Sequence, residues 1–320
     1  MFSASQSSTG TSSPSDDFYV PDREEYPLAA HFWGSPEIVA VHSDHGTRIA
    51  MFPLEFIRKG GDNTWSYVLY VVCQLIVLEP GQSCQLQNED GIELDLNEAP
   101  EAGSFRLVLE PGQSCQLQNE DGIELDLNEA PEAGSFRLHV EGSQSGVTFS
   151  HGPEYFSRFK APNPHGSIST RSNSRRSSIN QSNFREAIIA RDGVCIVSDV
   201  YWQVCTSAHI APYSRPDLYE HFYKDRGELQ MFHPSVGLLL RDDLHHAFDR
   251  LMMSLYEKDE TLYVHFFHPV YSGKNDWHGK AIPPDFFRGP PEDRPDPTLL
   301  HWHYSQCVKA RIRGFAVGML

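Results

Sequence analysis

The sequence lacks a long apolar run. Its most apolar stretch, residues 67–78, holds 12 residues and includes Gln74, whereas a helix that crosses a bilayer needs about 20 apolar residues. A membrane span is therefore excluded, and we predict that this run forms a buried β-strand. The start of the chain, from Met1 to Ser8, has no basic stretch and no apolar core. We therefore expect no secretory signal and a location in the nucleus or cytoplasm.

Cysteine and several catalytic motifs are also scarce. The six cysteines fit a reducing compartment, so we predict free thiols rather than a disulfide framework. Only Cys195 and Cys205 lie near the histidine-rich segment discussed below, which excludes a four-cysteine zinc site there. The sequence has no glycine-rich phosphate loop, no Gly-x-Ser-x-Gly turn and no zinc-protease helix. These absences argue against the nucleotide-binding, serine-hydrolase and zinc-protease classes that those motifs mark.

Positive charge is scarce, but unevenly so. The formal net charge is −17. Residues 1–182 carry 11 basic and 25 acidic side chains, whereas residues 183–320 carry 15 basic and 18 acidic ones. The acidity therefore belongs to the N-terminal part. The repulsion from nucleic acid that the net charge suggests does not extend to the C-terminal part.

A perfect tandem repeat supplies most of that acidity. Residues 77–107 recur without a change as residues 108–138, and each copy carries seven acidic residues and one basic residue. Stacked repeat arrays usually have at least three diverged copies, so we disfavour a structural array. The identity indicates a recent duplication or an error in the gene model. We expect the second copy to bulge out as a loop or to compete with the first for one place in a β-sheet.

Composition divides the chain into four parts. Residues 1–20 are rich in Ser, Thr and Gly and predict a disordered tail. Residues 21–150, with short apolar runs between Gly, Pro and Asp, predict a β-rich domain that contains the repeat. Residues 151–182, with five basic residues and one acidic residue, predict a flexible basic linker. Residues 183–320 have a globular composition, and the fold class expected for the whole chain is α+β.

The last part has the sequence pattern of two strands followed by a helix. The elements that we expect, in order, are a helix over 184–193, strands over 194–197 and 205–212, an extended or turn-like segment over 237–240, a helix over 242–251, and a hairpin within 255–267. This order is the one that a compact ββα metal site requires.

Three polar side chains in this part suggest hydrolytic chemistry. His209 lies in a predicted strand, and His245 and Asp249 are four residues apart in a predicted helix. Side chains at i and i+4 share a helix face, so this pair could bind one metal ion. The neutral imidazole of His209 could accept a proton near pH 7. A base beside a cation is what phosphodiester hydrolysis needs. The alternative is a buried strand histidine and an ordinary surface pair.

The segments 195–198, 208–210 and 237–249 resemble, in order and spacing, the HNH endonuclease family, in the branch common among fungal proteins. Residues 278–280 and 295–304 look like the tail of the same branch. The resemblance covers about residues 183–320 and implies an HNH (ββα-metal) domain after the β-rich one. It further implies a metal-dependent endonuclease that acts on nucleic acid, DNA more than RNA, with no membrane partner.

The resemblance also implies a role for each residue. His209 is the expected catalytic base, and His245 and Asp249 are expected to bind a divalent ion, which could be Mg²⁺, Mn²⁺ or Zn²⁺. We expect His246 and Arg241 to lie next to the base and the metal ligands and to contact these side chains without binding the ion themselves.

Two positions depart from the family pattern. Val236 stands where the family usually has an asparagine that orients the base, and Ala208 stands where many members have an additional metal ligand. These departures keep an alternative open, in which the chain is a catalytically degenerate HNH-fold protein that binds a partner or acts as a scaffold.

Overall fold

The computed structural model describes residues 28–43, 46–62, 64–77, 149–154, 174–224, 231–270 and 277–314, together with the backbone of seven strands between residues 82 and 140. Side chains are described from residue 180 onward within the helix that begins at 174. The tail expected at residues 1–20 lies outside these ranges.

The N-terminal part contains three short helices, a mixed five-stranded sheet and two separate strand pairs. The helices are α1 (Ala29–Trp33), α2 (Leu54–Arg58) and α3 (Trp65–Cys73). The strands are β1 (Ile38–Ser43), β2 (Arg48–Pro53), β3 (Gln82–Asn88), β4 (Asp90–Glu93), β5 (Leu96–Glu98), β6 (Ser104–Pro111), β7 (Gln118–Glu120), β8 (Leu127–Glu129) and β9 (Gly134–Val140). The two separate pairs are β4 with β7 and β5 with β8.

The C-terminal part contains longer helices and two small sheets. Its helices are α4 (Ser174–Asp192), α5 (Pro216–Tyr223), α6 (Asp242–Asp249) and α7 (Pro297–Arg311), and its strands are β10 (Cys205–His209), β11 (Gly237–Arg241), β12 (Met253–Lys258), β13 (Thr261–Phe266) and β14 (Ala281–Ile282). Short 3₁₀ helices are η3 (Trp202–Val204), η5 (Pro234–Val236), η7 (Pro284–Phe286) and η8 (Pro291–Asp293). The mixture of helices with small sheets confirms the α+β class.

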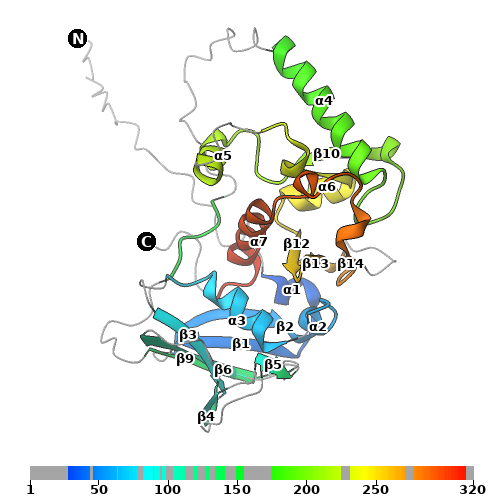
Figure 1. The fold of residues 1–320 in the computed structure, drawn as a ribbon. Helices are drawn as coiled ribbons and strands as arrows, with labels where there is room; N and C mark the ends of the chain where they lie inside the picture. The colour runs from blue at the N-terminus through cyan, green and yellow to red at the C-terminus, as the bar shows by residue number, and fades with distance from the viewer. Residues whose placement is uncertain are drawn as a thin grey trace, which may run out of the picture.

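The larger sheet has the strand order β2-β1-β6-β3-β9. Strands β1 and β2 pair antiparallel, as the two short apolar runs at 37–42 and 47–52 predict. Helices α1, α2 and α3 lie on the side of this sheet that faces α7 and β12 (Figure 1). The sheet therefore lies at one end of the molecule, with the C-terminal elements stacked above it.

The apolar run at 67–78 is not the predicted strand, because most of it belongs to helix α3. The hydroxyl of Thr64 caps this helix by accepting a hydrogen bond of 3.3 Å from a backbone N–H three residues further on. Val68, Val71 and Val72 are fully buried, and their i, i+3, i+4 spacing places them on one helix face. Because the core encloses α3 on nearly all sides, most of its residues are apolar. The sequence therefore shows no 3.6-residue alternation of apolar and polar positions.

Two further elements differ from the expectation. Residues 194–197 form a turn rather than a strand, held by a single bridge between Val194 and Tyr201. Helix α4 begins at Ser174, inside the segment that we expected to be a flexible linker. The remaining linker residues, 155–173, lie outside the described ranges, so the domain boundaries stay a prediction.

The N-terminal and C-terminal parts share one hydrophobic core. Buried side chains from residues 29–76 and from residues 184–312 form a single cluster. Main-chain hydrogen bonds join the same parts, since Met51 N donates to Ile312 O over 2.8 Å and Gly314 N donates to Ile49 O over 2.7 Å. The early helices and strands β1 and β2 therefore support the C-terminal part directly. Among the described helices, none combines the length and apolarity that a membrane crossing requires.

The cysteines agree with the expectation only in part. Cys195, Cys205 and Cys307 are free and buried. Cys73, at the end of α3, is disulfide-bonded, so the expectation of free thiols throughout the chain is wrong for this residue.

Candidate active site

A two-stranded hairpin and one helix build the candidate site. Strands β10 and β11 pair antiparallel, with His209 opposite Gly237 and Cys205 opposite Arg241. Helix α6 starts directly after β11 and returns across the hairpin with Leu244, Ala247 and Phe248 buried. This i, i+3, i+4 set faces the core, which directs the other face of α6 toward the His209 end of the hairpin.

His209 lies among aromatic rings. The ring of Phe184, from α4, stacks on it with 4.3 Å between centroids and 22° between planes. The rings of Tyr213 and Phe232 lie 5.7 Å and 6.2 Å away. The imidazole Nε2 lies 3.0 Å from the carbonyl oxygen of Met231. A carbonyl only accepts, so Nε2 carries the hydrogen and Nδ1 is the ring's acceptor.

The electrostatic surroundings keep His209 neutral. Burial is the largest influence and lowers the pKa of His209 below its usual 6.5. The hydrogen bond to Met231 acts in the opposite direction, and His245 and Asp249 also act on the ring, with opposite signs. The structure therefore brings His209 within electrostatic range of both predicted metal ligands, and it holds the base in its proton-accepting form.

His245 and Asp249 face each other on α6. Nε2 of His245 lies 3.2 Å from Oδ2 of Asp249, and the two side chains are 24% and 44% exposed. Two adjacent ligands of an octahedral ion, each about 2.1 Å from it, lie about 3.0 Å apart. The pair therefore fits two neighbouring positions of one divalent ion. In the described part of the chain no group of three or more His, Cys, Asp or Glu side chains converges on a metal position, so water and substrate oxygens would complete the shell.

The two expected supporting residues are placed differently. His246 is exposed, and its ring lies parallel to that of His245, with 6.0 Å between centroids. Arg241 lies at the opposite end of the hairpin from His209, four strand residues or roughly 13 Å away. Its guanidinium binds the carboxylate of Asp243 through contacts of 2.6 Å and 2.7 Å. Arg241 thus lies beside the start of α6 and away from the three candidate residues.

Val236, which replaces the expected asparagine, is fully buried. Its carbonyl accepts a hydrogen bond of 2.9 Å from Ile210 N, next to the base. The orienting contact to the imidazole comes from the main chain of Met231 instead. Loss of the asparagine side chain therefore leaves the orientation of His209 fixed.

A buried ion pair behind the hairpin was not predicted. The guanidinium of Arg191 binds both carboxylate oxygens of Asp192 at 2.5 Å and 2.8 Å, and it also donates to the carbonyls of Pro234, Gly237 and Asp293. The Asp192 carboxylate accepts a hydrogen bond of 3.0 Å from Leu239 N. This network fixes the end of α4 to η5 and β11. In the sequence, Arg191 and Asp192 look like an ordinary pair of neighbouring surface charges, and nothing in the surrounding residues indicates that they are buried.

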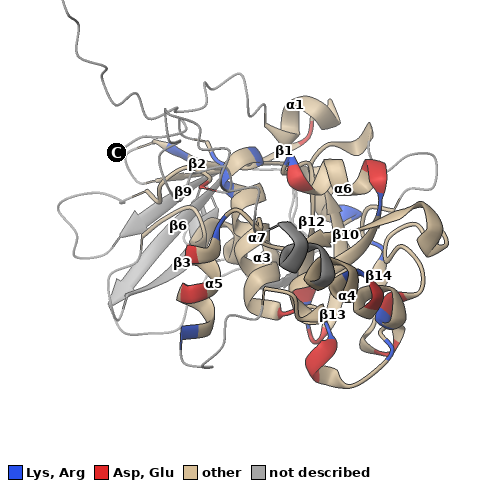
Figure 2. Cartoon of the chain, turned by 90° about the horizontal axis from the view of Figure 1, so that it is seen from above, with Lys and Arg blue, Asp and Glu red and all other residues tan. Residues whose placement is uncertain are grey.

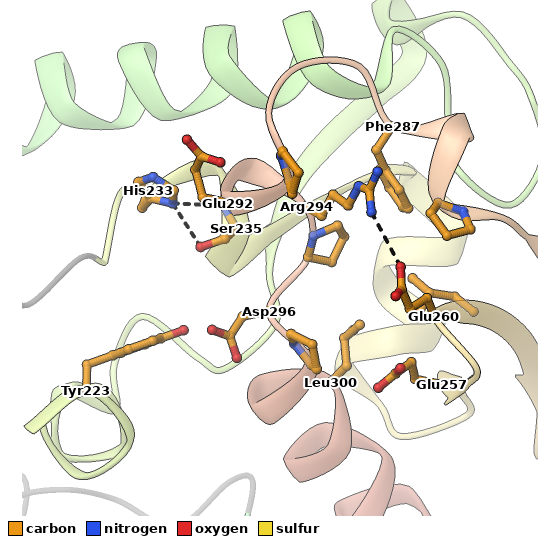
Figure 3. A pocket seen from close by; sticks show the side chains of 15 residues that line it. Tyr223, His233, Ser235, Glu257, Glu260, Phe287, Glu292, Arg294, Asp296 and Leu300 are labelled. Carbon is orange, nitrogen blue, oxygen red and sulfur yellow. Dashed lines mark hydrogen bonds and ion pairs between the residues drawn. The ribbon is translucent and has the colours of Figure 1, made fainter. Parts of the chain in front are cut away.

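A cavity of about 610 Å³ lies near η5 and the start of α7 (Figure 3). His233 Nε2 lies 3.6 Å from Asp293, and Arg294 lies 3.8 Å from Glu260 at its walls. None of the three candidate residues is among those that line it. The cavity is therefore separate from the candidate active site.

Charged side chains of both signs are interspersed over the C-terminal elements (Figure 2). Lys280, for example, lies 2.8 Å from Asp199. At the hairpin, Arg241 is followed directly by Asp242 and Asp243, so long-range attraction of an anion would be weak there. Binding of nucleic acid would depend on local contacts at the site.

A hairpin and a returning helix that present one histidine opposite a His/Asp pair define the ββα class of metal-site folds. Residues 195–256 match the HNH endonuclease family. This segment, which extends from the turn before β10 into β12, is therefore an HNH domain, and the resemblance to the HNH endonuclease family is confirmed over these residues. Neither the curated proteins nor the solved structures include a match to the chain.

Proposed function

We propose that this chain is a metal-dependent endonuclease that hydrolyses phosphodiester bonds in nucleic acid, with DNA as the substrate. One observation carries the proposal. The Met231 carbonyl binds Nε2 of His209, so Nδ1 is the acceptor nitrogen of a neutral ring that lies within electrostatic range of His245 and Asp249. The match of residues 195–256 to a nuclease-type family supports it.

Each of the three side chains has a distinct role in this proposal. His209 accepts a proton at Nδ1 from the attacking water, and the Phe184 ring stacked on it limits the rotation of the imidazole. His245 and Asp249 would hold the divalent ion, which when bound supplies a Lewis acid beside the scissile phosphate. Because both side chains are partly exposed, a phosphate has access to them from solvent.

The test compares substitutions of two histidines in the full-length protein: His209, the proposed base, and His246, which is exposed beside the site. Supercoiled plasmid and a single-stranded RNA of mixed sequence are incubated with Mg²⁺ or Mn²⁺ and with wild type, His209→Ala or His246→Ala. We expect plasmid nicking by wild type, a loss of about 10²- to 10⁴-fold in His209→Ala, and activity within about twofold of wild type in His246→Ala, because His246 is exposed beside the site.

Three outcomes would count against the proposal. Equal nicking by His209→Ala and wild type would remove His209 from the reaction. Cleavage of the RNA alone would contradict the choice of DNA. A third result would be that wild type binds Mn²⁺ in calorimetry, that His245→Ala loses this binding, and that wild type cleaves neither substrate. The protein would then be a binding or scaffold form of the fold, the alternative that Val236 and Ala208 favour.

A further inference from the structure

Strands β6 and β9 come from different copies of the tandem repeat, yet they pair with the same strand. In one pairing Ala40 of β1 lies opposite Ser104 of β6, and both strands run parallel. In the other, Val39 of β1 lies opposite Gly134 of β9, again in parallel. The two registers differ by 31 residues, which is the length of one repeat. Equivalent residues of the two copies are therefore assigned to the same positions along β1.

Strand β3, on the other side of β6, shows the same duplication. Gln87 of β3 pairs antiparallel with Arg106 of β6 and also with Arg137 of β9. Arg137 is the counterpart of Arg106 in the second copy. Strands β6 and β9 moreover pair with each other between equivalent residues, such as Ser104 with Ser135. Strands β1 and β3 therefore each pair with the same segment in both of its copies.

A strand has only two hydrogen-bonding edges, and β2 already fills one edge of β1. Each backbone N–H and C=O on the other edge serves one ladder partner at a time. Two strands in one register therefore cannot both occupy that edge in full. We propose that the place between β1 and β3 is a single slot that takes residues 104–107 or residues 135–138 in turn, so that the chain exchanges between two arrangements of the same sheet.

The two arrangements have nearly balanced stabilities. The seated segments are identical in sequence, so their pairing with β1 and β3 is the same. They differ in the two loops that flank the seated segment. The first copy has 15 residues (89–103) before it and 41 residues (108–148) between it and Phe149, which bridges Ile76, whereas the second copy has 46 residues (89–134) before it and 10 residues (139–148) after it. Loop closure becomes less favourable with roughly the 3/2 power of loop length, so the two differences largely offset each other and the arrangements differ by less than about twofold. Both arrangements are therefore populated.

The experiment blocks each copy separately in the full chain. Proline removes a backbone N–H and is excluded from central strands, so Arg106→Pro blocks the first copy and Arg137→Pro blocks the second. The equilibrium constant for folding is measured by urea denaturation followed by circular dichroism. Because neither copy is strongly preferred, we expect Arg106→Pro and Arg137→Pro each to lower it by only about two- to threefold. The double variant should lower it by far more than the product of the two.

Two controls keep the result decisive. The double variant Arg106→Ala/Arg137→Ala retains both N–H groups and reports the loss of the side chains alone. Deleting residues 108–138 leaves one copy, and deleting either copy gives the same chain because they are identical. This single-copy protein should fold as stably as wild type within a few fold.

Other outcomes overturn the exchange. If Arg106→Pro alone lowers the equilibrium constant for folding as much as the double variant does, the slot belongs to the first copy. If Arg137→Pro alone does so, the slot belongs to the second copy. If the deletion destabilises the protein strongly, both copies are needed at once. A double proline variant as stable as wild type would show that neither segment occupies the slot.

Discussion

The imidazole of His209 shows how a main-chain contact can replace a missing side chain. The family pattern places an orienting asparagine at the position of Val236, and from the sequence alone its absence threatens the geometry of the base. In the fold, the Met231 carbonyl lies 3.0 Å from Nε2 and orients the ring instead. A carbonyl is present at every residue, so no sequence pattern could mark the one that makes this bond. The substitution therefore removes a group whose role the backbone can take.

The buried pair Arg191–Asp192 gives a prediction for a single carboxylate. Burial raises the pKa of Asp192 even though Arg191 binds it, so the pair itself adds little net stability. Breaking it is costly, because Asp192→Asn leaves the buried guanidinium without its counter-charge. We expect the free energy of unfolding to fall by about 3–5 kcal/mol in urea denaturation at pH 7.

The exposed pair Arg241–Asp243 provides the matched control. It has the same bidentate geometry, but the Asp243 side chain is 54% exposed. Asp243→Asn should therefore lower the free energy of unfolding by less than about 1 kcal/mol, because water screens the pair. Equal effects of the two substitutions would show that the network around Asp192 does not hold α4 to the hairpin.

At the scale of single elements, helix α3 depends on one capping residue. The Thr64 hydroxyl accepts a hydrogen bond of 3.3 Å from Tyr67 N and donates one of 2.8 Å to the buried carboxylate of Asp62. Thr64→Ala should lower the free energy of unfolding by about 1–2 kcal/mol, because the N-terminal N–H group of α3 loses its partner. Thr64→Ser keeps the hydroxyl and should cost much less in the same urea titration. A loss of equal size in both variants would assign the effect to the methyl group instead.

The same helix explains which elements the sequence could predict. Helix α6 has one buried face, so its period is visible in the sequence and its prediction is confirmed. Strand β10 confirms the strand predicted over 205–212, whereas β11 is buried along its whole apolar run and could be predicted only as extended or turn-like. Helix α3 is covered on most sides, and its run of valine and aromatic residues has the composition of a strand. The evidence for a helix lay in Asp62-Asn63-Thr64, three cap-forming residues directly before the run. Just after the turn at 194–197, Asp199 has a φ of 57°, a local bend that apolar composition does not reveal.

The candidate site was predictable to a similar, limited extent. The i, i+4 spacing of His245 and Asp249 specifies a shared helix face, and their side chains lie 3.2 Å apart. Arg241 lies far from His209 although it directly precedes α6, because its position in β11 places it opposite Cys205. Only the strand register separates the two ends of the hairpin, and register depends on pairing between distant segments.

Across the whole molecule, buried histidines join parts of the chain that are far apart in sequence. His265 Nε2 donates to the carbonyl of Gly60 over 2.7 Å, and its Nδ1 accepts from the Tyr304 hydroxyl at 2.6 Å. His278 Nε2 donates to the carbonyl of Phe56 over 2.7 Å. His303 stacks on Phe248 of α6, with 3.5 Å between ring centroids. These histidines serve the core, and each has hydrogen-bond partners that suit a neutral ring.

Their neutrality makes the stability of the molecule depend on pH. Burial lowers the pKa of His265 to about 3, that of His278 to about 4 and that of His303 to about 3. In the unfolded chain the same groups take up protons below about pH 6.5. Between these limits the unfolded state binds about three more protons, so the free energy of unfolding decreases as the pH falls. The stabilisation is complete above pH 6.5 and is lost toward pH 4.

The slope of the free energy of unfolding against pH, measured above pH 5, reports the histidines and not the carboxylates. Three histidines contribute roughly 4 kcal/mol per pH unit below pH 6, so a domain of ordinary stability should unfold by about pH 4–5. The carboxylates of Asp217 and Asp243 have lowered pKa values, and their contribution is lost only as the pH falls through 3.8 and below. Urea titrations at pH 7.0, 6.0, 5.5 and 5.0 measure the slope before that range is reached. A flat profile between pH 6 and 5 would mean that the histidines are protonated in the folded protein, which would contradict the buried contacts that join its two halves.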